Sequence, residues 1–302
     1  MTEPDTQDSQ RRPRFGRAAR WSLALALLLM GLSAAQLAYR YFLPTDGWLV
    51  VAEDLSAADL MYYANLVGAP SGVLAEDIVT GVEGTPLGAF QPGETPPFWY
   101  AGNVLSYDVR RGGQTLTVAV PIVHWTLAGI ARGMTVDPSQ FISLVGVLIL
   151  LGVSLLAFFK RPEDPAARAL LIFVAANAAQ SISSLLPDGL STSFDPLANV
   201  AVGFFSYMIF GVVLAPALLS FTLVFPHPKP VIVRHPWLAY TPFLIGAVIL
   251  VVLVTANTWQ VGWFGTLFML LASLVSLVHS VLTMRDVVSR AQLLWAFGGI
   301  LL

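Results

Sequence analysis

The chain has 302 residues and a net charge of −2, with 56% hydrophobic and only 11% charged residues. Soluble domains carry about a quarter charged residues, so this composition and a mean hydropathy of +0.72 exclude an ordinary soluble protein. The charge balance indicates no nucleic-acid partner, and the absence of cysteine removes disulfides, thiol nucleophiles and Cys-ligated metals. Apolar blocks of about 20 residues, enough to cross about 30 Å of hydrocarbon, predict a multi-pass membrane protein.

The N-terminal part predicts a basic tail followed by a membrane anchor. Residues 1–20 are polar and end in an arginine-rich run, and residues 21–43 are mostly apolar. A secretory signal peptide, or a twin-arginine signal suggested by Arg11 and Arg12, is the alternative. No small-x-small cleavage site follows the apolar core, and the bulky residues Tyr39 and Tyr41 come directly after it. We therefore expect an uncleaved anchor with a cytoplasmic N-terminus.

Residues 44–123 have a different composition, which predicts one small β-rich domain. Polar and turn-forming residues return, together with short runs of strand character at 48–51, 77–79, 104–109 and 115–120. The last two runs flank Gly112 and Gly113, as expected for a hairpin whose turn needs positive φ. Residues 56–66 are predicted to form a short helix with Ser56 as its N-cap.

After a linker at 124–139, apolar blocks return and make up a multi-span module at 140–302. The predicted spans lie near 140–159, 166–186, 198–225, 237–256, 259–284 and 293–302. Every second connection contains Lys or Arg, in phase with the arginine-rich tail, and basic loops face the cytoplasm. This alternation places residues 44–139 outside the cytoplasm. The last span is too short to cross a bilayer, so we expect the natural chain to continue beyond Leu302.

The segment from Gly68 to Leu87 resembles the central stretch of bacterial PDZ domains, where G-L-x-x-G-D-x-I leads to a V-x-G-x-P-L turn. Residues 109–118 are similar to the closing PDZ hairpin, and 47–52 to the opening strand. Glu76 stands where the family usually has glycine, and 88–103 look like an insertion. The matching residues are Gly68, Asp77, Ile78, Gly84, Pro86, Gly112 and Gly113. The resemblance implies capture of a peptide by strand addition.

The order of parts resembles the membrane sensor region of bacterial sensor histidine kinases, especially the quorum-sensing type that controls competence in bacilli. Those proteins combine an anchor, an external PDZ-like domain and a multi-span module, here with Phe225-Pro226-His227-Pro228 closing one span. The resulting fold class is a mainly α membrane protein with about seven transmembrane helices. A small β-rich PDZ-like domain lies between the first and second helices.

This resemblance implies an inner-membrane signal-input region whose signal is a peptide or small molecule. A cytoplasmic kinase domain using ATP and Mg²⁺ would follow it, with a homodimer and a response regulator as expected partners besides the lipid bilayer. The alternative is a PDZ-bearing scaffold, transporter-like protein or membrane protease without kinase output. No catalytic, metal or cofactor motif is predicted within residues 1–302, since none of the four histidines is followed by glutamate as H-E-x-x-H requires.

Two groups of residues are candidate contacts for a ligand or partner. Phe98, Trp99 and Tyr100 form an aromatic run in a Pro- and Gly-rich loop, which predicts packing on the membrane or on the β domain, or contact with a partner. Asn177 and Gln180 belong to a polar helix face that must turn toward other helices in lipid. That face predicts either bundle packing or a polar pocket. His279, near one span end, is interpreted as a packing or interfacial residue, with a haem or proton-relay role as the alternative.

Overall fold

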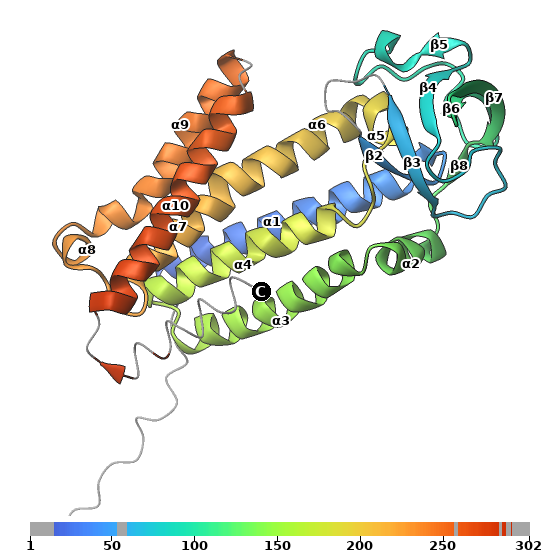
Figure 1. The fold of residues 1–302 in the computed structure, drawn as a ribbon. Helices are drawn as coiled ribbons and strands as arrows, with labels where there is room; N and C mark the ends of the chain where they lie inside the picture. The colour runs from blue at the N-terminus through green and yellow to red at the C-terminus, as the bar shows by residue number, and fades with distance from the viewer. Residues whose placement is uncertain (1–14, 53–58, 257–258, 284–285, 288–290, 292–302) are drawn as a thin grey trace, which may run out of the picture. The chain divides into compact units, whose positions relative to one another are not determined.

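The computed structural model describes residues 15–52, 59–256, 259–283, 286–287 and 291. Most of the predicted basic tail and the predicted seventh span lie outside these residues. The chain divides into two compact units, to which α1, α3 and α4 each contribute. Residues 31–147 and 178–207 are here called the β unit, and the described residues up to 30, 148–177 and from 208 onward the helical unit. Figure 1 labels the elements of both.

Four helices in the described part of the chain are long and apolar enough to cross a membrane. They are α1 (Arg17–Tyr41), α3 (Pro138–Lys160), α4 (Pro165–Ser183) and, over Phe264–Thr283, α10 (Trp259–Thr283). They coincide with predicted spans at 21–43, 140–159, 166–186 and 259–284. This agreement indicates a membrane protein, as the composition predicts.

Two further predicted spans are helical but divided into shorter pieces. Residues 198–225 correspond to α6 (Pro196–Phe204), a π-helical stretch η3 (Phe205–Leu214) and α7 (Ala215–Val224). Residues 237–256 correspond to a 3-10 turn η4 (Pro236–Tyr240) and α9 (Thr241–Ala256), preceded by the short α8 (Pro230–Arg234). The apolar parts, Gly211–Val224 and Pro236–Val252, are shorter than the four long helices. The predicted linker 124–139 contains α2 (Leu127–Val136).

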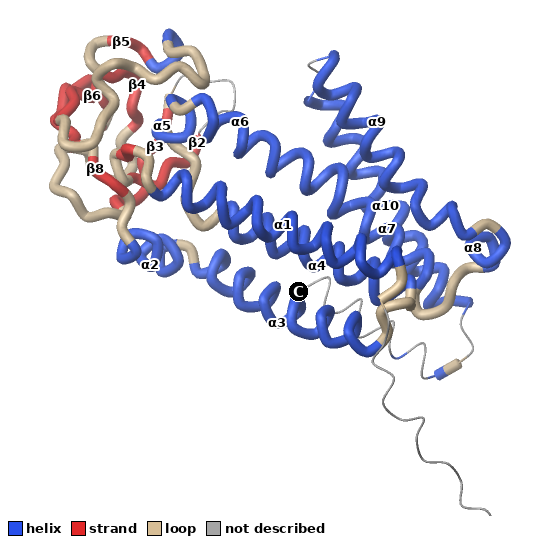
Figure 2. The backbone as a smooth tube through the Cα atoms, turned by 180° about the vertical axis from the view of Figure 1, so that it is seen from behind, coloured by secondary structure: helices blue, strands red, loops and turns tan. Residues whose placement is uncertain are grey.

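The strands of the β unit form an antiparallel sheet, red in Figure 2. Its order is β2-β3-β4-β6-β7, with β5 paired to β4; a separate pair, β1 with β8, joins the two chain segments that enter and leave the domain. Alternation along β6 points Leu105, Tyr107 and Val109 into the core. The strands are β1 (Pro44–Thr45), β2 (Trp48–Ala52), β3 (Leu60–Asn65), β4 (Ile78–Val82), β5 (Thr85–Pro86), β6 (Val104–Arg111), β7 (Gln114–Pro121) and β8 (Val123–His124). A three-residue 3-10 turn, η2 (Leu87–Ala89), follows β5.

The predicted helix at 56–66 is wrong where the structure describes it. Residues 60–65 form β3, which pairs with both β2 and β4. Tyr62 is fully buried and its ring contacts that of Trp48, with centroids 5.7 Å apart. Aromatic side chains favour a half-buried sheet surface, and these cross-strand contacts override local helix propensity. Ser56, the predicted N-cap, lies outside the described residues.

Within the helical unit, α7, α9 and α10 pack together. The backbone of α9 also approaches that of η3 closely at Gly246. An added Cβ at this position would lie 3.1 Å from the Gly211 carbonyl oxygen and 3.1 Å from Val212 Cα. Small residues allow such close helix contacts in membrane bundles. A second cluster joins α1, α3 and α4 around Ala19, Phe158 and Leu171.

Candidate functional site: the α5 joint

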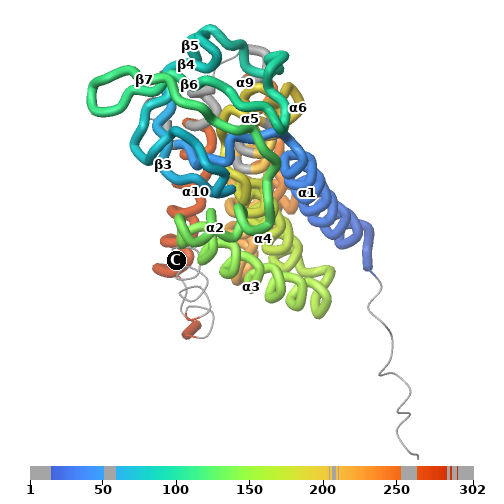
Figure 3. Tube along the Cα trace, turned by 90° about the vertical axis from the view of Figure 1, so that its right-hand side faces the viewer, coloured from blue at the N-terminus to red at the C-terminus, as the bar shows by residue number. Residues whose placement is uncertain are grey.

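The connection from α4 to α6, residues 184–196, is here called the α5 joint because it contains the short helix α5 (Leu190–Phe194). Leu190 and Phe194 are buried in the same core as the β-sheet residues. The Phe194 ring lies edge-on to Trp99 and Phe90, with centroids 4.9 and 5.0 Å away. Figures 1 and 3 show α5 lying against the strands. A segment between two helices therefore completes the core of the β domain.

Hydrogen bonds also hold α5 against the β domain. The backbone N–H of Gly93 donates to the Ser193 carbonyl at 2.7 Å, and the Thr95 hydroxyl donates to the Phe194 carbonyl at 2.8 Å. These partners come from the loop that the sequence indicates as an insertion. That loop therefore holds α5 through one backbone bond, one side-chain bond and aromatic packing.

The aromatic run in this loop divides into buried and exposed residues. Trp99 is buried against Phe194, and Phe98 packs against the same core. Tyr100 is 55% exposed. The predicted packing on the β domain is therefore present for Phe98 and Trp99, while contact of these residues with a ligand or partner stays a prediction.

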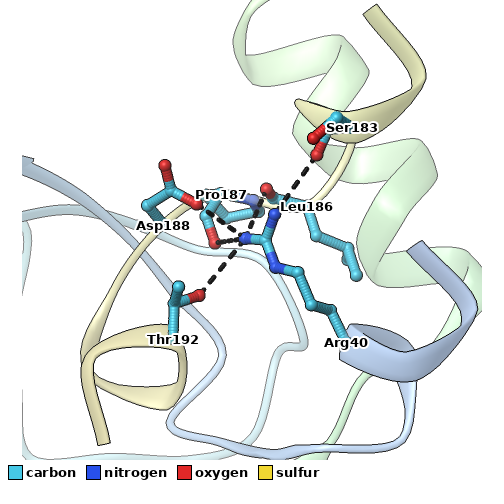
Figure 4. A network of polar contacts seen from close by, with 6 residues as sticks. All are labelled: Arg40, Ser183, Leu186, Pro187, Asp188 and Thr192. Atoms are coloured by element: carbon cyan, nitrogen blue, oxygen red, sulfur yellow. Dashed lines mark hydrogen bonds and ion pairs between the residues drawn. The ribbon is translucent and has the colours of Figure 1, made fainter. Parts of the chain in front are cut away.

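Arg40, in the last turn of α1, holds the other side of the joint (Figure 4). Its side chain is almost fully buried and donates to the carbonyl oxygens of Ser183 at 3.2 Å, Leu186 at 2.9 Å and Pro187 at 2.9 Å. It also bonds the Asp188 carboxylate at 2.8 Å and the Thr192 hydroxyl at 3.3 Å. The last carbonyls of a helix have no intrahelical partner and carry partial negative charge. Arg40 satisfies one of them, the Ser183 carbonyl, together with the Leu186 and Pro187 carbonyls of the chain that follows α4.

The ion pair with Asp188 contributes less than these carbonyl contacts. The Asp188 side chain is 63% exposed. Water therefore screens its attraction to the guanidinium, and such pairs stabilise by about 0–1 kcal/mol. The three carbonyl bonds come from a guanidinium that is almost fully buried, so the Arg40 site is principally a cap on the chain that leaves α4.

Two more bonds link α1 to the joint and to α4. The Tyr39 hydroxyl donates to the carboxylate of Asp195 at 3.0 Å, and Asp195 caps α6 by accepting from the backbone N–H of Ala198 at 2.7 Å. The Ser33 hydroxyl donates to the Ala179 carbonyl at 2.5 Å. One face of α1 thus holds the end of α4 and the start of α6.

The predicted polar face of α4 lies partly in this region. Gln180 is half-buried, and its amide oxygen has no hydrogen-bond partner among the described residues; neither does either amide atom of Gln36, which is 6% exposed. Asn177 is half-buried and belongs to the part of α4 in the helical unit. The Ala179 and Ser183 carbonyls of α4 accept hydrogen bonds from Ser33 and Arg40 of α1, which supports the bundle-packing interpretation. Ligand contact at Asn177 and Gln180 stays a prediction.

The residues that resemble the PDZ motif lie in turns, at strand ends and, for Asp77, in an ion pair with Arg111. Asp77 accepts two bonds from Arg111, at 2.7 and 2.6 Å, and the hydrogen bonds from Arg111 lower the pKa of this buried carboxyl. Gly68, Gly84, Gly112 and Gly113 all have positive φ, while Ile78 begins β4 and Pro86 lies in β5. Glu76, where the family usually has glycine, has φ of 72°. The conformation at that position suits glycine, although the residue is glutamate.

Strand addition needs a free sheet edge, and the described sheet ends at β2 and β7. The edge of β7 is partly occupied, because the Gly72 N–H donates to the Ala119 carbonyl at 2.9 Å. Peptide capture stays a prediction.

A buried carboxylate that the sequence analysis missed lies in the β-domain core. Asp46 is 4% exposed and accepts bonds from the hydroxyls of Tyr62 at 2.6 Å and Tyr107 at 3.2 Å. It also accepts from the backbone N–H of Trp48 at 3.2 Å. Burial raises the pKa of Asp46, although these hydrogen bonds oppose the shift, and burial likewise raises the pKa of both tyrosines.

No group of three metal-binding side chains occurs among the described residues. His279 lies on an exposed face of α10, and its packing or interfacial role stays a prediction. Arg40 was missed because it lies among the aromatic residues that end the first span. Its spacing from Ser33 and Gln36 on one helix face was the available signal. Comparison of the chain with family models, curated proteins and solved structures gave no match.

Proposed function

We propose that this chain is the membrane signal-input region of a two-component sensor histidine kinase. The β domain receives an external signal, and the helices relay it to a cytoplasmic output domain that binds ATP and Mg²⁺ and phosphorylates a response regulator. The order of anchor, β domain and multi-span module supports this function. The positive φ of Gly68, Gly84, Gly112 and Gly113 in the β domain also supports it.

The proposed topology has seven spans in a bacterial inner membrane, a cytoplasmic N-terminus and an external β domain. Basic residues at the end of α3, such as Lys160, and those in α8, such as Arg234, support it because basic residues at the cytoplasmic ends of spans set orientation. Arg40, at the opposite end of α1, is the exception. Its burial among carbonyls at and after the end of α4 explains why a basic residue occurs there.

The observation that carries the proposal is the insertion of α5 into the β-domain core. A relay needs an element whose arrangement depends on the sensing domain and also determines the position of a helix. Phe194 belongs to the β-domain core, and the next residue, Asp195, caps α6. A shift of that core is therefore passed directly to a helix end.

The test is autophosphorylation of the full-length gene product in membrane vesicles from its own cells. We expect acid-labile phosphohistidine after incubation with Mg-ATP. We also expect Phe194→Ala to change the level of phosphohistidine several-fold, because this variant would uncouple the β-domain core from α6. Phe141→Ala, at an exposed position of α3, is the matched control and should leave the level unchanged. Absence of phosphohistidine in the wild-type protein would reject the kinase assignment and favour a protein without kinase output.

A further inference from the structure

The helical unit carries a groove that neither the α5 joint nor the β domain uses. It has a volume of about 680 Å³ and runs between α1, α4 and the η4–α9 segment. Its lining is mainly apolar and includes Leu25, Ile172 and Phe243. A smaller pocket of about 40 Å³ shares Ile172 and Phe243 with it. Ligand pockets commonly have volumes of about 300–1,000 Å³, so the larger groove suffices for a ligand.

Polar and aromatic groups gather along the groove with one cation near its end. Arg17, in the first turn of α1, lines it together with Trp21 and Tyr240, which are 71% and 57% exposed. Leu25 lies eight residues further along α1, which corresponds to about 12 Å of helix. Exposed Trp and Tyr beside a cation are typical of the level of lipid headgroups.

A second arginine, Arg168, lies in the smaller pocket and already has an acidic partner. Arg168 lines the smaller pocket, but it donates to the Glu163 carbonyl at 3.1 Å and lies 3.7 Å from the Glu163 carboxylate. The same carboxylate accepts from the Gly16 N–H at 2.6 Å. Arg168 is thus already engaged with Glu163 and does not line the larger groove, whereas Arg17 is exposed and does line it.

From this arrangement we infer that the groove binds one anionic phospholipid. An acyl chain lies along Leu25, Ile172 and Phe243, and Arg17 contacts the phosphate of the headgroup. An apolar groove exposed to lipid takes acyl chains, while basic residues between membrane helices select anionic headgroups. The charge at the end of an otherwise apolar groove therefore defines both the ligand and its orientation.

The test is native mass spectrometry of the full chain in detergent with equimolar phosphatidylglycerol and phosphatidylcholine of matched acyl chains. We expect the wild type to retain phosphatidylglycerol in excess. Arg17→Gln should lower the ratio of the two bound lipids about five-fold, since one basic residue near a membrane surface contributes about that factor. Arg20→Gln is the matched control, because Arg20 is exposed on the same helix and does not line the groove.

A second pair of variants tests the acyl-chain part. Leu25→Trp fills the groove and should reduce retention of both lipids. Leu28→Trp, at a position 56% exposed outside the lining, should not. An unchanged ratio in Arg17→Gln, an equal fall in Arg20→Gln, or full retention in Leu25→Trp would overturn the inference. Displacement of the lipid by inorganic phosphate would show that the site takes a free anion instead.

Discussion

The Arg40 cap can be tested by Arg40→Met, which keeps much of the side-chain volume and removes every donor. Ser183, Leu186 and Pro187 would each lose a charge-assisted bond to a carbonyl oxygen. Such bonds contribute about 1.5–3 kcal/mol each, but three bonds to one guanidinium are not additive. Loss of the exposed Asp188 pair adds at most about 1 kcal/mol. We expect a total loss of about 3–5 kcal/mol, because three carbonyl oxygens lose their donor at a buried position.

Urea unfolding in micelles, followed by fluorescence of the buried tryptophans of the β unit, measures this loss. Arg40→Lys should lose about half as much free energy of unfolding as Arg40→Met. An ammonium has fewer donors and no planar fork to reach acceptors on several sides. Arg110→Met is the matched control. Arg110 is 46% exposed and pairs with Asp59, so its loss should stay below about 1 kcal/mol. If Arg40→Met were no more destabilising than Arg110→Met, the capping argument would be refuted.

Three further predictions concern the buried carboxyl, a strained residue and a helix contact. Because burial raises the folded-state pKa of Asp46, wild-type stability should fall relative to Asp46→Asn as pH rises from the usual value of 3.8 through the folded pKa. Parallel pH profiles in thermal unfolding would contradict this. Glu76→Gly should gain up to about 1 kcal/mol in urea unfolding by relieving a left-handed conformation. Glu94→Gly, without positive φ, should lose up to about 1 kcal/mol, and the reverse order would refute the strain. Gly246→Ile should sharply lower the melting temperature in micelles, whereas Gly152→Ile, with nothing within 4 Å of an added Cβ, should shift it little. Similar shifts in both would exclude the close contact.

The long helices and the strands β2, β4, β6 and β7 were predictable because each has a local signal. Apolar stretches with almost no charge predict α3 and α4, and alternation predicts β6. The Gly112-Gly113 turn was equally local, since its positive φ values require residues such as glycine. β3 was not predictable in this way. Its pairing with β2 and β4 is a tertiary interaction that decides against the helical tendency of its sequence.

The α5 joint lay beyond sequence reasoning for a related physical reason. Phe194 and Trp99 are separated by 95 residues, and nothing local at either position indicates the other. An aromatic residue in a loop between spans reads as interfacial, and the aromatic run in the Pro-rich loop predicts packing on the membrane or on the β domain without indicating its partner residue. Only the folded β domain brings the two rings together. The contacts of Arg40 likewise depend on the fold, because its carbonyl partners are backbone groups that every sequence possesses.

The contacts of the α5 joint also give α1 a structural role besides anchoring the chain. A helix that only anchored the chain would need an apolar surface, since polar groups buried without partners are costly. Instead Ser33, Tyr39 and Arg40 direct their bonds to the end of α4 and to the residue that caps α6. The end of α1 therefore connects two other helices to the β domain, which begins three residues after α1 ends. Because Phe194 lies one residue before the α6 cap, the β-domain core and this helix end have little freedom to move independently.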